Sequence, residues 1–196
     1  MDPRPITLDG RHVRLEPLTM AHAADLFAAL SEDIEIWKWL SIEPPTTLAA
    51  MEAYIASALE MQSAGREVAF AQIARSAGRA VGSTRYLSIS PRDLGLEIGW
   101  TWIGKSWQRT AVNTEAKLLL MRHAFEDLGA VRVQLKTDAR NLQSQAAIER
   151  LGAVREGVLR KLQRTRNGVI RDTAMYSVIA EEWPAVRAGL VARLEA

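Results

Sequence analysis

The stretch that decides the fold is Leu94–Gly129, LGLEIGWTWIGKSWQRTAVNTEAKLLLMRHAFEDLG. Its first part alternates large apolar side chains with small or polar ones and is rich in aromatic residues. This period of two predicts a β-strand. The apolar positions are Leu96, Ile98, Trp100 and Trp102, and the alternate positions are Gly95, Glu97, Gly99 and Thr101.

The second part of the same stretch predicts a long amphipathic helix with a period near 3.6. We expect Asn113 or Thr114 to cap its start and Gly129 to end it in the left-handed conformation. A helix start presents unpaired N–H groups and the positive end of the helix dipole, so it can bind a diphosphate. The expected apolar stripe contains Leu118, Met121, Phe125 and Leu128, while Lys117, Arg122, Glu126 and Asp127 are expected to face elsewhere.

The loop between this strand and helix resembles the acetyl-CoA signature of the GNAT acetyltransferases, Gln/Arg-x-x-Gly-x-Gly/Ala. The strand LEIGWTWI and the segment NLQSQAAIERLGAVREGVLR at 141–160 are similar to the branch that contains ribosomal-protein N-terminal acetyltransferases. The resemblance covers nearly the whole chain and implies acetyl-CoA as co-substrate. The loop residues implied to bind it are Gln108, Arg109, Thr110, Ala111, Val112, Asn113 and Thr114.

The motif departs from the family pattern at its two small positions, which are Ala111 and Asn113 in this chain. Without glycine the backbone approaches a pyrophosphate less freely. Alanine is still small, and asparagine tolerates positive φ better than most residues. We therefore expect a cofactor site of altered form.

The predicted order of elements, β-α-α-β-β-β-α-β-α-β-β, resembles the GNAT fold over a single domain spanning residues 1–196. The expected class is α/β, with a mixed, mostly antiparallel sheet of about seven strands and helices on both faces. In that fold the strands before and after the signature helix splay apart. Backbone groups of Thr101, Trp102 and Ile103 are then implied to pair with the pantetheine amides, because a splayed edge leaves its N–H and C=O groups unpaired.

A competing motif overlaps this one, since GWTWIGKS at 99–106 satisfies the P-loop pattern Gly-x-x-x-x-Gly-Lys-Ser/Thr. A P-loop needs a helix that starts at its lysine, whereas residues 100–103 continue the strand alternation. No repeated strand and helix units precede the segment. We therefore favour the acetyl-CoA interpretation over a nucleotide enzyme.

Acetyl transfer to an amine needs a base for the amine, stabilisation of an oxyanion, and a proton or hydrogen bond for the leaving thiolate. Glu97 is the candidate base, because it lies on the cofactor strand and many members of the resembling family carry a functional glutamate there. The alternative is a structural carboxylate paired with Arg or Lys.

Asn141 and Ser144 stand at the predicted start of a later helix. The resemblance implies that Asn141 contacts the cofactor and that Ser144 points towards the thioester sulfur as the acid. A purely structural alternative is that Asn141 caps the helix. Tyr176 is expected to be a core or pocket residue, although many members of the resembling family use a tyrosine as the acid.

Trp37 and Trp39 lie two residues apart in an irregular segment. They are candidates for lining a pocket that binds the amine acceptor, a peptide N-terminus or a small amine. The alternative is that these aromatics cover the core.

Composition limits the function classes. The chain has 196 residues, no cysteine and a net charge of +2. Without cysteine there is no disulfide, thiolate metal site or cysteine acyl-enzyme, so direct transfer is the simpler mechanism. The three scattered histidines indicate no metal site. We expect a cytoplasmic protein with no nucleic-acid or membrane partner, for which a homodimer is plausible. A catalytically silent acyl-CoA-binding module is the alternative of a different class.

Overall fold

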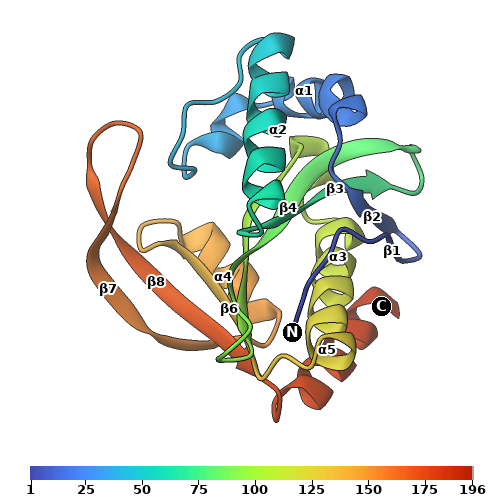
Figure 1. The fold of residues 1–196 in the computed structure, drawn as a ribbon, viewed down its shortest axis with the longest axis vertical. Helices are drawn as coiled ribbons and strands as arrows, with labels where there is room; N and C mark the ends of the chain where they lie inside the picture. The colour runs from blue at the N-terminus through green and yellow to red at the C-terminus, as the bar shows by residue number, and fades with distance from the viewer. Residues whose placement is uncertain (196) are drawn as a thin grey trace.

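The computed structural model describes residues 1–195, whose strands form one eight-stranded sheet in the order β1-β2-β3-β4-β5-β6-β8-β7 (Figure 1). Every neighbouring pair is antiparallel except β5 and β6, which run parallel. The predicted mixed, mostly antiparallel sheet is therefore confirmed. The strands are β1 (Leu8–Asp9), β2 (Val13–Pro17), β3 (Val68–Ala74), β4 (Arg79–Ser90), β5 (Gly95–Ile103), β6 (Arg132–Asp138), β7 (Val154–Arg164) and β8 (Ile170–Ile179).

The described chain has eight strands where about seven were predicted, and the first two, β1 and β2, form a hairpin near the start of the chain. The chain turns at Gly10, whose N–H donates to the carbonyl of Val13 (3.0 Å), and β1 then pairs with β2. A glycine is needed here, since a Cβ on Gly10 would lie 2.5 Å from the carboxyl carbon of Glu115.

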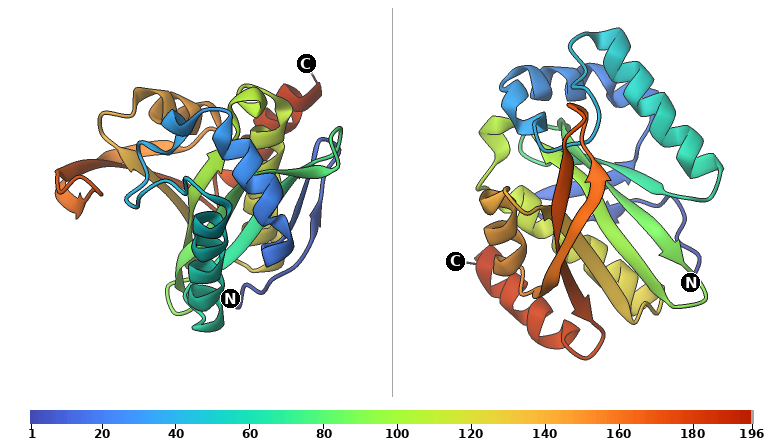
Figure 2. Two further views of the ribbon diagram at one scale, coloured as in Figure 1. Left: turned by 90° about the horizontal axis from the view of Figure 1, so that it is seen from above. Right: turned by 90° about the vertical axis from the view of Figure 1, so that its left-hand side faces the viewer.

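Helices cover both faces of the sheet, as predicted (Figures 1 and 2). Thr47 caps α2, since its Oγ1 accepts from the N–H of Ala50 (3.1 Å). The predicted stop at Gly129 is confirmed by its φ of 67°. A π-helical turn at His123–Asp127 precedes that stop. The helices are α1 (Ala23–Ser31), α2 (Leu48–Ser63), α3 (Ala111–Arg122), α4 (Leu142–Arg150) and α5 (Trp183–Glu195).

Two hydrophobic cores lie on opposite faces of the sheet. The first packs α3, α4 and α5 against the sheet and includes Leu96 and Ile98 of β5. The second packs α1 and α2 against the other face and includes Trp102 of the same strand. Residues 96 and 102 would share a face if the alternation were unbroken. The prediction that Leu96, Ile98, Trp100 and Trp102 form one face is therefore wrong.

A β-bulge in β5 explains the change of face. Arg85 of β4 pairs with Gly99 and Ser83 pairs with Trp102, so β5 carries one residue more than β4 between these pairs. Trp100 takes a φ of 50° at this point. The extra residue turns Thr101 towards α3, where the side chain of Lys117 contacts it.

Glu115 of α3 should be a large contributor to stability. Its carboxylate accepts hydrogen bonds from the backbone N–H groups of Arg11 (2.8 Å), His12 (2.6 Å) and Val13 (2.7 Å). We expect Glu115→Ala to lower the free energy of unfolding by about 2–4 kcal/mol, because it leaves backbone donors without an acceptor. The control Glu52→Ala, at an exposed position of α2, should change it by no more than about 0.5 kcal/mol. Urea denaturation measures both, and equal effects would contradict the prediction.

Candidate active site

The sheet opens between its two parallel strands. β5 and β6 pair only over Gly95–Glu97 and Arg132–Gln134, and the structure records no pair between them beyond Glu97. The rest of β5 therefore turns a backbone edge away from β4 towards a gap. Thr101, Trp102 and Ile103 are the residues predicted to bind pantetheine there. The carbonyl of Trp102 already accepts a hydrogen bond from Gln72 Nε2 (3.3 Å). Thr101 is half-buried and Ile103 is buried.

Helix α3 starts beside this gap, at Ala111. Its N-cap is Thr110, whose Oγ1 accepts from the N–H of Val112 (3.3 Å), so the prediction of Asn113 or Thr114 as the cap is wrong. Thr110 has extended backbone geometry, which an N-cap requires, whereas residues 113 and 114 already lie in the first turn. The unpaired N–H groups of the helix start therefore fall within the motif itself.

The next helix also begins near the gap and is linked to the motif loop. Gln143 of α4 donates from Nε2 to Oε1 of Gln108 (3.3 Å). Asn141 caps α4, because its Oδ1 accepts from the N–H of Ser144 (3.1 Å), so the capping interpretation is confirmed. Ser144 is half-buried. The structure thus brings together Gln108 and the start of α4, which lie more than 30 residues apart in the sequence.

Tyr176 is fully buried on β8 beneath α4, as expected of a core residue. Its hydroxyl donates to Oε1 of Glu149 (3.0 Å) and to Oε1 of Gln145 (3.2 Å). Burial, followed by the hydrogen bond to Glu149, raises the pKa of the tyrosine above its usual value. This hydroxyl is therefore engaged with α4.

Glu97 is almost completely buried, with 1% of its surface exposed. Its Oε2 accepts from Gln134 Nε2 (3.0 Å) and pairs with Lys136 Nζ (3.0 Å), both on β6. Its Oε1 lies where a side chain on Gly99 would begin, 2.9 Å from an ideal Cβ, so that glycine leaves room for the carboxylate. The pairing with a lysine, the structural alternative for this residue, is therefore present, and it fixes the carboxylate at the edge of the gap.

The two tryptophans lie in different surroundings. Trp37 is fully buried in the second core, where its ring lies 5.1 Å from that of Tyr54 and 5.3 Å from that of Trp102. Trp37 is therefore a core aromatic, which was the alternative to a role in acceptor binding. Trp39 is half-buried, and the guanidinium of Arg140 lies 5.6 Å from its ring centre.

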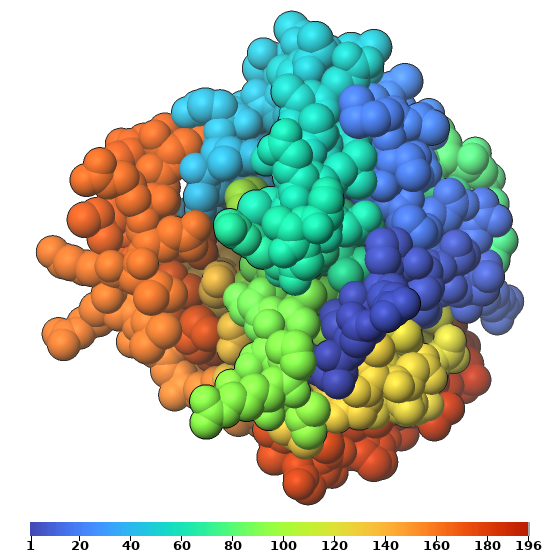
Figure 3. Space-filling model, in the orientation of Figure 1, coloured from blue at the N-terminus to red at the C-terminus, as the bar shows by residue number. Residues whose placement is uncertain are grey.

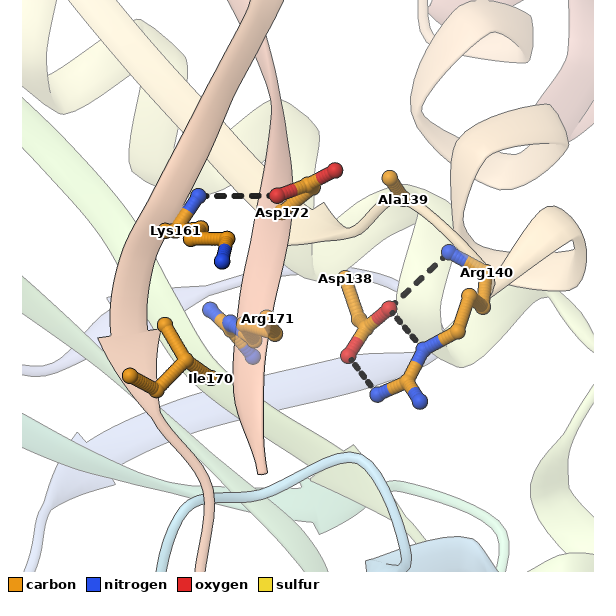
Figure 4. A pocket seen from close by; sticks show the side chains of 7 residues that line it. All are labelled: Asp138, Ala139, Arg140, Lys161, Ile170, Arg171 and Asp172. Carbon is orange, nitrogen blue, oxygen red and sulfur yellow. Dashed lines mark hydrogen bonds and ion pairs between the residues drawn. The ribbon is translucent and has the colours of Figure 1, made fainter. Parts of the chain in front are cut away.

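A cavity of about 310 Å³ opens next to Arg140. It is lined by the end of β6 and by the facing parts of β7 and β8 (Figure 4). In Figure 3 the surface is hollowed between the orange β7–β8 hairpin and the blue-green segment that leads into α2. The sequence analysis missed its charged residues, although the alternation of the segment VQLKTD does place Gln134, Lys136 and Asp138 on one face of a strand.

Lys117 is a further residue that the sequence analysis missed, because it was expected to face away from the core. Its side chain is buried and its Nζ donates to Oγ1 of Thr101 (2.6 Å) and of Thr84 (3.4 Å). Burial lowers the pKa of this amine from its usual value of 10.5 to about 7. The lysine thus joins α3 to the two strands that meet at the β-bulge.

The P-loop interpretation fails on geometry. Residues 99–103 belong to β5, and only a short 3-10 turn, Lys105–Trp107, follows them. The long helix begins at Ala111, beyond the motif's lysine and serine. Within residues 1–195, His, Asp and Glu side chains form no group of three or more that could hold a metal ion, and no helix is long and apolar enough to span a membrane.

Comparison with known proteins places this geometry in context. Residues 12–154 match the family described as "Acetyltransferase (GNAT) domain". The chain is similar to a GCN5-related N-acetyltransferase from Brucella melitensis, with 34% identity, a TM-score of 0.93, and coverage of 99% of this chain and 87% of that one. It is similar to a candidate acetyltransferase from T. thermophilus, with 42% identity, a TM-score of 0.89 and coverage of 99% and 100%. RimJ of Mycobacterium smegmatis, in complex with CoA-disulfide, has the same fold, with 21% identity, a TM-score of 0.83 and coverage of 96% and 95%.

The buried amine of Lys117 should make stability depend on pH. Its pKa is about 7 in the folded chain and about 10.5 when unfolded, so the unfolded chain binds more protons between these values. Stability should therefore rise with pH across this window, and the cost of the buried charge should be complete below pH 7.

The measurement is urea denaturation of the wild type and of Lys117→Met at several pH values. From pH 7 to pH 10 the wild type should gain roughly 2–4 kcal/mol relative to the variant. The control Lys105→Met removes an exposed lysine and should run parallel to the wild type. A Lys117→Met curve that is also parallel would contradict the prediction.

Proposed function

The chain belongs to the GNAT acetyltransferase family, and from this premise we propose that it transfers the acetyl group of acetyl-CoA directly to a primary amine held in the same complex. The observation that carries this proposal is the unpaired edge of β5 beyond Glu97, which lies beside the capped start of α3. An extended pantetheine arm can pair with such an edge, and a diphosphate can bind at such a helix start.

In this proposal acetyl-CoA lies along the gap between β5 and β6. Thr101 and Ile103 offer backbone groups to the pantetheine amides, with Trp102 between them. The N–H groups of Ala111, Asn113 and Thr114 face the diphosphate, and Gln108, Arg109 and Thr110 form the rim of the loop. Support comes from the hydrogen bond between Gln143 and Gln108, which holds the start of α4 and therefore Asn141 close to this loop. RimJ of M. smegmatis, which shares the fold, binds a CoA compound.

The chemistry needs a base, because an alkyl amine with a pKa near 10.4 is mostly protonated at neutral pH. We assign this role to Glu97. The ammonium group gives up a proton to Glu97, directly or through one water, and the neutral nitrogen attacks the thioester carbonyl carbon. The ion pair with Lys136 and the hydrogen bond from Gln134 hold the carboxylate in one orientation. Its second oxygen, Oε1, remains on the side of Gly99.

The tetrahedral intermediate then collapses and the C–S bond breaks, while the nitrogen gives up its second proton and the CoA sulfur takes up a proton, so that the products are the amide and the CoA thiol. We assign Ser144 to this step, as a hydroxyl that donates a hydrogen bond or a proton where negative charge develops on sulfur. It stands in the first turn of α4, so the positive end of that helix also favours the thiolate. The chain has no cysteine that could carry the acetyl group, which favours direct transfer.

The acceptor is proposed to enter from the side of the cavity near Arg140 and Trp39. Glu97 and Asp138 of this cavity lie on the same face of the sheet, since Glu97 pairs with Lys136, which stands two residues before Asp138 on β6. A peptide N-terminus and a small amine both fit a cavity that is open to the surface.

The catalytic assignments are tested with Glu97→Gln and Ser144→Ala. Glu97→Gln should lower kcat by about 10²-fold or more, because it removes the base. Ser144→Ala should lower kcat by roughly tenfold, the loss of one hydrogen bond to developing charge. Both should bind acetyl-CoA within about threefold of the wild type, since neither removes a phosphate contact.

The measurements are steady-state kinetics on a panel of amines and isothermal titration with acetyl-CoA, CoA and ATP with magnesium. Gln143→Ala serves as a control near the loop and should weaken CoA binding with little change in kcat. Unchanged kcat in both catalytic variants would remove these two roles. Acetyl-CoA binding without turnover of any amine by the wild type would instead favour a silent acyl-CoA-binding module.

A further inference from the structure

The face of β6 and β8 that looks towards Trp39 carries a row of polar side chains. Residues directly opposite in an antiparallel pair point to the same face. Asp138 of β6 pairs with Thr173 of β8, and Lys136 pairs with Met175. Arg171 lies two residues before Thr173, on the same face. The second core, which covers this side of β3, β4 and β5, contains no residue of β6 or β8.

The carboxylates along this face already have partners. Asp138 accepts from Nε (2.9 Å), Nη2 (2.7 Å) and the backbone N–H (2.9 Å) of Arg140. The hydrogen bond from Arg140 holds the pKa of Asp138 below its usual value. Glu97 is paired with Lys136, and Asp172, whose side chain alternates to the opposite face of β8, accepts from the backbone N–H of Lys161 (2.8 Å). These acidic groups therefore already have partners within the chain.

The basic side chain of Arg171, by contrast, lacks a full set of hydrogen-bond partners within residues 1–195. Arg171 lines the cavity (Figure 4) and is only 7% exposed, and its one recorded hydrogen bond runs from Nη1 to the carbonyl of Trp39 (3.3 Å). Its buried Nε has no hydrogen-bond partner among residues 1–195. The hydroxyl of Thr173, which is fully buried, also has none in the described chain. Two unpaired polar groups thus share the face beside the cavity.

The charges around the cavity leave a positive balance. Of the residues that line it, Arg140, Lys161 and Arg171 are cationic, and Asp138 and Asp172 are anionic. Burial is the largest influence on Arg171 and lowers its pKa, so the nearby Asp138 and Glu97 compensate its charge only in part. An anion next to its guanidinium would complete that compensation.

We propose that this cavity is a subsite for a carboxylate on the acceptor, bound by the guanidinium of Arg171 with Thr173 beside it. This inference rests on the proposed function, because it names the class of amine that the site takes. A carboxylate matches the planar guanidinium through two parallel hydrogen bonds. The acceptor then spans the face with its carboxylate at Arg171 and its amine towards Glu97.

Two sources can supply such a carboxylate next to an amine. One is a free amino acid, and the other is the acidic side chain of the first residue of a peptide. Each has a matched amide, which keeps the amine and the shape and removes the negative charge. The probes are alanine with alaninamide, and Asp-Ala-Ala-amide with Asn-Ala-Ala-amide.

The test is isothermal titration of the CoA-loaded protein with both pairs, followed by acetyl-transfer assays on the same compounds. In at least one pair the carboxylate should bind about tenfold or more tightly than its amide. Arg171→Met should reduce that preference to within about threefold and leave affinity for the amide unchanged. Arg171→Lys keeps the charge without the fork and should give an intermediate preference.

Two further variants separate a binding role from a structural one. Thr173→Val keeps the shape of the side chain and should lower the preference by roughly threefold. Arg164→Met removes an exposed arginine from the same hairpin and should leave the preference unchanged. If Arg171→Met unfolds, the Arg171→Lys and Thr173→Val results decide the question.

The outcomes distinguish this inference from the proposed function. A preference for carboxylates that Arg171 controls, without acetylated product, would support the subsite and contradict amine acetylation. Acetylated product with equal binding of both members of each pair would overturn the subsite and leave the proposed function standing. The pair that shows the preference identifies the source, a free amino acid for the first and a peptide for the second.

Discussion

The β-bulge at Gly99 and Trp100 is the constraint on which the rest of the structure depends. Before it, Leu96 and Ile98 anchor β5 to α3, and after it Trp102 anchors the same strand to the opposite core. One strand therefore holds both helical layers to the sheet. The bulge also coincides with the stretch of β5 that is not paired with β6. The extra residue thus lies where the sheet opens and acetyl-CoA is proposed to bind.

Buried charged side chains pack on both sides of this bulge, and burying them costs some stability. Lys117 is buried, and within residues 1–195 its amine has no recorded carboxylate partner but donates to the hydroxyls of Thr101 and Thr84. On the other side of the sheet, the guanidinium of Arg85 lies 5.0 Å from the rings of both Trp100 and Tyr54 and pairs with Glu67. Buried charges seldom stabilise a fold in themselves. They do restrict the strand to one geometry, as the proposed acetyl-CoA site requires.

Much of the local structure followed from side-chain chemistry next to the backbone. Asn141 accepts a backbone N–H group at a helix start, and Gly129 takes the positive φ that ends a helix, as predicted. The same reasoning failed at the start of α3, where Thr110, Asn113 and Thr114 are all competent caps. Choosing between competent caps requires the path of the chain that enters the helix, and that path is set by β5 and the turn after it.

The sequence by itself determined the mixed, mostly antiparallel sheet and the family, because these depend on periodicity and on neighbouring residues. Only the tertiary structure decided where the strand alternation breaks, that Lys117 points inwards, and that Arg171 and Asp138 share one face. Each of these follows from the pairing of strands that are distant in the chain, and a shift of one residue in that pairing moves a side chain to the opposite face. The sequence alone does not show which acidic and basic residues line the cavity, because strand register decides which side chains meet there.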